Sequence, residues 1–199
     1  MKLLLFSDLH CDLDACVELV EKSNQVDMLI GAGDFGNLRR NIDTTINALC
    51  KITKATVVVP GNSESYDELR AACLNWPSAI VLHGSKTNIN GQTFYGIGGG
   101  IPVTPFGSWS WDFNEYQASV LLKDFPSQAI LVSHSPPKGI LDRSSSGQSL
   151  GSSAIKEVLE KKKPKLLVCG HIHESCGQSK VFGESIVINA GPKGIFWEL

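Results

Sequence analysis

Short strands alternate with amphipathic helices in the N-terminal third of the chain, and this alternation leaves few folds open. Runs of apolar and β-branched residues at Lys2–Phe6, Met28–Ile30 and Thr56–Val59 predict buried strands. Between them, apolar residues recur at helical spacing from Leu13 to Val20 and from Ile42 to Cys50. Such strand–helix–strand units form parallel strands with right-handed crossovers. We therefore expect a parallel sheet whose functional loops lie at the carboxyl ends of its strands.

The second half of the chain adds hairpins to this pattern. Asn90-Gly91 and Gly183-Glu184 are turn dipeptides flanked by short apolar runs, so each predicts a hairpin. Two further strands, Ala129–Ser133 and Leu166–Cys169, are separated by a predicted helix from about Ser152 to Lys163. Because so many strands would overfill one sheet, we expect an α/β protein with two mixed sheets.

Composition limits the class of protein. The 199 residues are 42% hydrophobic and 19% charged, which fits a single domain spanning residues 1–199. A formal charge of -2 argues against an extended nucleic-acid or membrane surface. The apolar stretch before Ser7 is too short for a signal or membrane segment, so we expect a cytoplasmic protein. The six cysteines form no CxxC pair, so we expect reduced structural thiols.

Two stretches predict long loops, at residues 98–115 and 139–153. The first is rich in glycine and proline and contains Trp109, Trp111 and Phe113. These aromatic residues could form a lid over a binding site, or they could fold back on the core or fill a dimer contact. The sequence leaves both interpretations open.

Five predicted strands are each followed by side chains that can bind metal. In chain order they are Asp8 and His10, Asp34, Asn62, His134, and His171 and His173. In extended chain, residues i and i+2 point the same way, so Asp8/His10 and His171/His173 each present two ligands to one side. Seven oxygen and nitrogen ligands are too many for one tetrahedral zinc. They suit two metal ions that share a bridging carboxylate.

Each of these residues alone has a structural interpretation. Asp34 could cap a helix, His134 could be a hydrogen-bonded core histidine, and Asn62 could be a turn residue. Independent structural roles do not explain why five strand ends all carry metal-binding side chains, so we favour the joint metal site. His83 lies outside the pattern, and we expect it to be structural.

The segments DLH, GD, GN, SH and GHIH, spread from Asp8 to His173, closely resemble the calcineurin-like metallophosphoesterases. The resemblance implies a four-layer sandwich of two mixed β-sheets flanked by α-helices, with a dinuclear metal centre at one edge. It also implies hydrolysis of phosphoesters, in which the two ions activate a water molecule and bind the phosphoryl group.

The resemblance implies which of the two metal ions each candidate ligand would bind. One metal would be bound by Asp8, His10, Asp34 and His173. The other would be bound by Asp34, Asn62, His134 and His171, with Asp34 bridging. The resemblance implies manganese or iron, zinc being chemically compatible as well, and we expect Asp34, Asn62 and His134 to act directly in catalysis.

The chain departs from the family at Ser63. Most relatives have a histidine there, which is thought to protonate the leaving oxygen, followed by an acidic residue that orients it. Ser63 has no useful pKa for this task, and Glu64 is a poor substitute because nearby dications favour its ionised form. We therefore expect metal binding to persist and phosphodiesters to be preferred over alkyl phosphomonoesters.

The alternative is a protein-binding scaffold on the same fold with little or no turnover. The complete ligand set argues against it, and Ser63 is the one feature in its favour. The substrate would be a small phosphoester, nucleotide-derived ones included. Arg39, Arg40 and Arg143 could contact phosphate or could be solvated surface residues. The sequence leaves the oligomeric state open.

Overall fold

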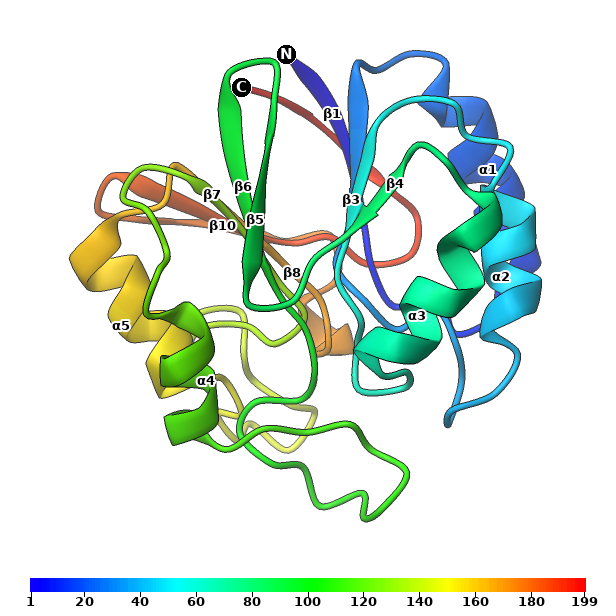
Figure 1. Cartoon of the computed structure of the whole chain (residues 1–199). Coiled ribbons are helices and arrows are strands. Elements are labelled where there is room, and N and C mark those ends of the chain that lie inside the picture. The colour runs from blue at the N-terminus through cyan, green and yellow to red at the C-terminus, as the bar shows by residue number, and fades with distance from the viewer.

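Two β-sheets pack face to face between two sets of helices (Figure 1). The structure is a computed structural model that describes residues 1–199. In the first sheet the strand order is β11-β1-β2-β3-β4. Its strands are β1 Lys2–Phe6, β2 Met28–Gly31, β3 Thr56–Val58, β4 Ala79–Val81 and β11 Ile195–Glu198. Strands β1 to β4 are parallel, as expected for the first three, and β11 pairs antiparallel with β1.

The second sheet has the order β5-β6-β7-β8-β10-β9. Its strands are β5 Ser85–Ile89, β6 Gln92–Ile97, β7 Ile130–Ser133, β8 Leu166–Cys169, β9 Ser179–Phe182 and β10 Ser185–Asn189. The four inner strands are parallel. The two antiparallel edge pairs are the hairpins predicted at Asn90-Gly91 and Gly183-Glu184, so both predictions are confirmed.

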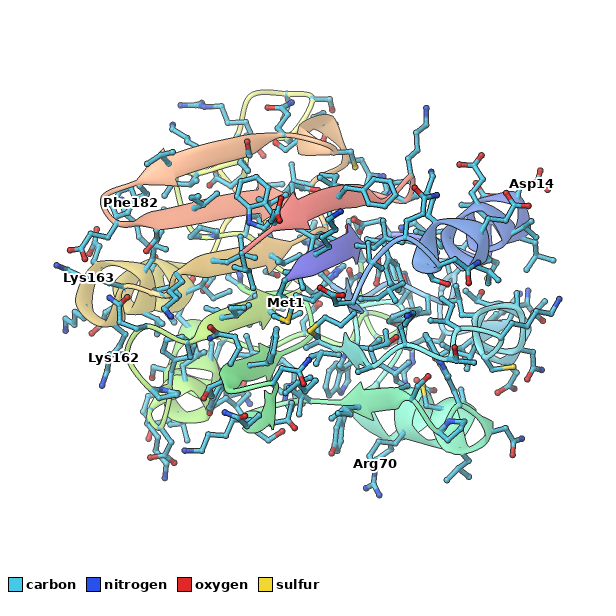
Figure 2. All side chains as sticks on the ribbon, turned by 90° about the horizontal axis from the view of Figure 1, so that it is seen from above. Met1, Asp14, Arg70, Lys162, Lys163 and Phe182 are labelled. Atoms are coloured by element: carbon cyan, nitrogen blue, oxygen red, sulfur yellow. The ribbon has the colours of Figure 1, made fainter.

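Helices cover the outer face of each sheet, on opposite sides of the molecule (Figures 1 and 2). The helices on the first sheet are α1 Leu13–Ser23, α2 Ile42–Leu49 and α3 Tyr66–Ala72. The helices on the second are α4 Glu115–Leu122 and α5 Ser153–Lys162. Short 3-10 turns lie at Cys73–Asn75 and His173–Ser175. Asp12 caps α1, because its carboxylate accepts the N–H of Ala15 at 3.0 Å.

Three apolar layers hold the four structural layers together. Between the sheets, side chains such as Leu5 and Ile30 meet Phe94 and Val132 from the opposite sheet. The other two clusters lie between each sheet and its helices. The predicted four-layer α/β sandwich is therefore confirmed. All six cysteines are free thiols. No helix combines the length and the apolar character that crossing a membrane would need.

Four elements were not predicted from the sequence: β4, β11, α3 and α4. Strand β4 has three residues, and β11 alternates between half-buried and exposed side chains, so neither has a buried apolar run. Both helices had a signal in the sequence. Ser65 with Glu68 and Asn114 with Gln117 form complete capping boxes at the starts of α3 and α4.

His83 lies where the chain passes from the first sheet to the second, between β4 and β5. Its ring packs 4.9 Å from Trp111, 5.0 Å from Phe113 and 5.9 Å from Tyr66, measured between ring centroids. Its Nδ1 accepts the N–H of Gly98 at 3.2 Å. As expected, His83 has a structural position. Burial lowers the pKa of its imidazole to about 4.

We predict that His83 makes the protein less stable in mild acid. Below about pH 6.5 the unfolded chain binds a proton at His83, whereas the folded chain stays neutral there until about pH 4. The free energy of unfolding should therefore show no effect of His83 above pH 6.5. As the pH falls from 6.5 toward 4, protonation of His83 in the unfolded chain should lower it by roughly 2–3 kcal/mol. Urea unfolding of the wild type and of His83→Gln at several pH values would measure it. Equal pH slopes for the two proteins would contradict it.

Candidate metal centre

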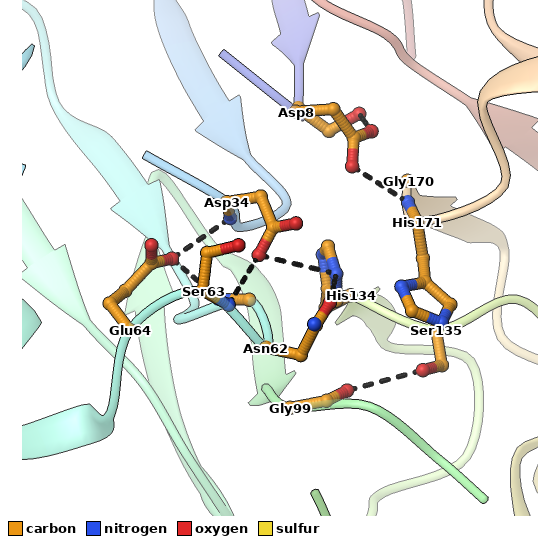
Figure 3. A network of polar contacts seen from close by, with 12 residues as sticks. Asp8, Asp34, Asn62, Ser63, Glu64, Gly99, His134, Ser135, Gly170 and His171 are labelled. Carbon is orange, nitrogen blue, oxygen red and sulfur yellow. Dashed lines mark hydrogen bonds and ion pairs between the residues drawn. The ribbon is translucent and has the colours of Figure 1, made fainter. Parts of the chain in front are cut away.

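The carboxyl ends of β1, β2, β3, β7 and β8 meet at one edge of the sandwich, and the predicted ligands gather there (Figure 3). The first sheet supplies Asp8, His10, Asp34 and Asn62, and the second supplies His134, His171 and His173. The Asp34 carboxylate contacts two histidine rings: His10 Nε2 is 3.4 Å from Asp34 Oδ2, and His134 Nε2 is 3.6 Å from Asp34 Oδ1. The Asp34 carboxylate thus lies between two histidines that the resemblance assigns to different metals.

The ligand atoms form two overlapping groups. Asp8, His10 and His173 offer atoms within 4.8 Å of one another, as do Asp8, Asp34 and His134. Asp8 is common to both groups, whereas the resemblance gives the bridging position to Asp34. His171 lies beside the second group, with its ring centroid 4.9 Å from that of His134. All seven predicted residues are therefore brought together at one site.

The arrangement of His134 and Asn62 fits a bound cation. His134 Nδ1 donates to the carbonyl oxygen of Ala32 at 2.8 Å, so in the neutral ring Nε2 carries the lone pair. Asn62 Oδ1 lies 3.1 Å from this Nε2, because the Asn62 amide nitrogen donates to Ser110 Oγ at 3.0 Å and fixes the orientation of the group. Two acceptors facing each other repel unless a cation or a proton lies between them.

The charges of the site shift several pKa values. Burial opposes the charge on Asp34, but His134 and His10 hold its pKa below the usual value. Burial likewise opposes the charge on His134, whereas the Asp34 and Asp8 carboxylates raise its pKa above the usual value. Burial and neighbouring His134 lower the pKa of His171 to about 3. A neutral imidazole is the form that binds metal.

Several ligands have an unusual backbone conformation. Asp8, His10, Asp34 and His171 all have positive φ values, of 55°, 43°, 58° and 68°. A non-glycine residue in this region costs about 1–3 kcal/mol and persists where the surrounding structure enforces it. Such strain concentrates at functional sites. Here it coincides with four of the seven candidate ligands.

Two glycines allow the ligand loops to approach each other. A Cβ atom on Gly61 would lie 2.0 Å from Asp34 Oδ1, and one on Gly170 would lie 2.4 Å from Asp8 Oδ2. Neither space could hold a side chain without moving a candidate ligand. Glycine at these positions is therefore a steric requirement of the site.

Glu64 has a structural position that the sequence did not reveal. Its carboxylate is buried and accepts three backbone N–H groups: Asp34 at 2.8 Å, Gly61 at 2.6 Å and Gly36 at 2.9 Å. Figure 3 shows the bond to Asp34. Burial and the negative charge of Asp34 raise its pKa to about 7. We call this carboxylate with its three amide partners the Glu64 clip. It connects the loop after β2 to the loop after β3.

Two cavities border the ligand cluster and share His173. The first, which we call the aromatic cleft, has a volume of about 320 Å³ and is lined by the ligands His10, Asp34, Asn62 and His171 together with Ser63, Phe106 and Trp109. The second, of about 490 Å³, is lined by Asp8, Cys176 and residues 190–195. His173 is exposed at the rim between them. The cluster is thus open to solvent on two sides.

The arginines considered from the sequence line neither cavity. Arg39 makes two hydrogen bonds of 2.8 Å to Glu68, and Arg143 donates to the carbonyl oxygen of Gly147. Arg40 is exposed. The role of Ser110 was not visible in the sequence, because nothing in its spacing signals a contact with Asn62.

Comparison with known proteins identifies the family to which the chain belongs. The family model for calcineurin-like phosphoesterases matches residues 1–175. Metallophosphoesterase domain-containing protein 1 of Homo sapiens is 29% identical over 122 residues. That alignment covers 57% of this chain and 34% of the human protein, so it spans about a third of the relative's length.

Solved structures share the fold at low sequence identity. The protein TT1561 of Thermus thermophilus superposes with a TM-score of 0.77 at 18% identity, covering 96% of this chain and 90% of that one. A dimetal phosphatase from Danio rerio gives a TM-score of 0.62 at 13% identity, covering 96% of this chain and 88% of that one. At these identities the likeness establishes the fold alone.

We predict that divalent metal stabilises the protein through Asp34. Manganese at a hundredfold excess over its dissociation constant should raise the melting temperature by roughly 5–10 °C. Asp34→Asn should abolish the rise, because it removes the carboxylate between the two histidines. The matched control is Asp43→Asn, in the first turn of α2, which should respond as the wild type does. A full manganese response in Asp34→Asn would contradict the assignment.

We predict that Glu64→Gln loses about 2 kcal/mol of unfolding free energy. Glutamine replaces one acceptor oxygen with an amide NH₂, which cannot accept a backbone N–H. Urea unfolding at about pH 8, above the pKa of Glu64, measures the loss. Glu18→Gln is the control, since it removes only a surface ion pair with Lys22 and should cost far less. Equal losses would mean that the amides of the Glu64 clip find other acceptors.

Proposed function

The chain belongs to the calcineurin-like phosphoesterase family, and on that premise we propose that it hydrolyses phosphodiesters with two divalent metal ions bound by the seven candidate ligands. The ligands would be Asp8, His10, Asp34 and His173 for one ion, and Asp34, Asn62, His134 and His171 for the other. We propose that manganese or iron ions occupy the two sites, and the nitrogen and oxygen donors would bind zinc as well. When bound, the ions supply Lewis acidity and neutralise charge on the phosphoryl oxygens.

The observation that carries the preference for diesters is the pair of cavities that meet at His173. A phosphomonoester has one organic substituent, which would fill one cavity. A phosphodiester has two, and each would have space on its own side of the cluster. The two cavities differ in lining, so the two arms of the substrate would be chemically different.

The surroundings of Ser63 support the same preference. Ser63 lines the aromatic cleft, and its backbone N–H donates to Asp34 Oδ1 at 2.8 Å. Its hydroxyl has no hydrogen-bond partner within the protein, and Glu64 points away into its clip. His83 lines neither cavity. The leaving group would therefore depart without a histidine or a free carboxyl group at position 63 or 64 to protonate it.

The residues of the cluster have separate tasks in this proposal. Asp34 would orient the two halves of the cluster, because its two carboxylate oxygens face His10 and His134. Asn62 would bind with its amide oxygen, which Ser110 directs toward His134. Exposed His173 would mark the point where the phosphoryl group enters between the two cavities.

We predict a steep dependence of rate on the leaving group. Across methyl aryl phosphodiesters, kcat/KM should fall as the pKa of the leaving phenol rises, because no side chain donates the proton. Ser63→His should flatten this slope and accelerate the poorest leaving groups by up to about 10²–10⁴-fold. Ser119→His, on the exposed side of α4, is the control for adding a histidine elsewhere.

A flat dependence that Ser63→His leaves unchanged would remove the argument from the missing proton donor. Failure to hydrolyse bis(p-nitrophenyl) phosphate with manganese, iron or zinc would instead favour the scaffold alternative. If hydrolysis occurs and is lost in Asp34→Asn, the scaffold alternative is excluded. Metal analysis of the purified protein would identify the ions.

A further inference from the structure

A stacked pair of aromatic side chains, exposed Phe106 and half-buried Trp109, lies at the rim of the aromatic cleft. Phe106 and Trp109, in the segment between β6 and α4, stack with ring centroids 5.4 Å apart and planes inclined by 14°. Both line the cleft, and Phe106 is 51% exposed. Other large aromatic side chains of the protein, such as Trp76 and Phe125, are buried instead. Exposed apolar surface beside a cluster of metal-binding residues indicates a binding surface.

Hydrogen bonds fix the segment that carries this pair to the candidate metal centre. The backbone N–H of Trp111 donates to the carbonyl oxygen of Asn62 at 2.9 Å. Ser110 Oγ accepts from the Asn62 side chain at 3.0 Å and donates to Asp112 Oδ1 at 2.7 Å. The stacked rings therefore keep a defined position relative to the ligands, as a specificity surface requires.

The 98–115 segment thus divides between the two roles that the sequence left open. Trp111 and Phe113 turn back and pack against His83. Phe106 and Trp109 face the aromatic cleft. Trp111 and Phe113 thus anchor the segment, and Phe106 and Trp109 are available to a ligand.

The rest of the cleft favours an uncharged, flat group. Leu38 and Leu150 also line it, and they are 51% and 40% exposed. No lysine or arginine lines it, and its one charged residue outside the ligand set is Glu174. A second phosphate in this cleft would have no basic partner and would meet a carboxylate. A flat ring would cover exposed apolar surface and stack on the aromatic pair.

We propose that Phe106 and Trp109 bind a flat aromatic ring on one arm of the substrate, so that the preferred substrates are aryl or nucleoside phosphodiesters. This inference rests on the proposed function, because it takes the ligand cluster as the site of the phosphoryl group. The aromatic cleft would then hold the ring, and the cavity at residues 190–195 would hold the other arm.

The test compares two probes that differ only in the ring: adenosine 5′-monophosphate and ribose 5-phosphate. Their affinities for the manganese-loaded protein would be measured by isothermal titration calorimetry, which does not depend on Trp109 as a reporter, and by competition against bis(p-nitrophenyl) phosphate. In the wild type, adenosine 5′-monophosphate should bind at least about tenfold more tightly. Trp109→Ala should weaken its binding by about 5–150-fold and leave ribose 5-phosphate unchanged.

Two further variants make the result specific. Trp109→Phe keeps a flat ring and should restore most of the preference for adenosine 5′-monophosphate. Phe196→Ala removes a comparably exposed aromatic ring on β11 that lines neither cavity, and should change nothing. Phe106→Ala should reduce the preference as Trp109→Ala does.

Other outcomes would overturn the inference. Equal binding of the two probes by the wild type would do so, as would a Trp109→Ala variant that weakens both equally. If Trp109→Ala instead converts a dimer to a monomer and keeps the preference for the ring, the aromatic pair is a subunit contact. Absence of metal-dependent hydrolysis would contradict the proposed function and not the ring site. The binding comparison of the two probes would still test the ring site in that case.

Discussion

The Glu64 clip is the interaction on which the geometry of the site most depends. A single buried carboxylate satisfies three backbone N–H groups that would otherwise be buried without partners. Two of those groups belong to Asp34 and Gly36, after β2, and the third belongs to Gly61, after β3. The clip thereby holds Asp34 in its positive-φ conformation and keeps the Asn62 loop against it. The clip thus positions the two candidate ligands of these loops, Asp34 and Asn62.

Glu64 has a structural role that is separate from the role of orienting a histidine at position 63. In the family pattern, the acidic residue at position 64 orients a histidine at position 63. Here that histidine is absent, and Glu64 nevertheless has a complete set of backbone partners. The acidic residue thus has a structural reason to be present that does not depend on the histidine. The loop can keep its shape while the chemistry at Ser63 differs.

The strand ends could be predicted from the sequence because their signal is local. A buried parallel strand is a visible apolar run, and the polar residue that follows it must lie at the shared sheet edge, as Asp8, Asp34 and His134 do. The Glu64 clip and the contact between Ser110 and Asn62 could not be predicted in this way. They join segments far apart in the chain, and only the folded arrangement brings them together. Strand β11 escaped prediction for a related reason, since its pairing with β1 outweighs its weak local pattern.

The candidate ligands come from both sheets, and this has a mechanical consequence. An ion held jointly by Asp34 and His134 would join the two halves of the sandwich at one edge, while apolar side chains join them along the interior. Sliding one sheet against the other would then change the shape of the ion site. By thermodynamic reciprocity, whatever the ion contributes to the alignment of the sheets, the alignment contributes equally to the affinity for the ion. The packing between the sheets and the affinity for the ion therefore share one coupling free energy.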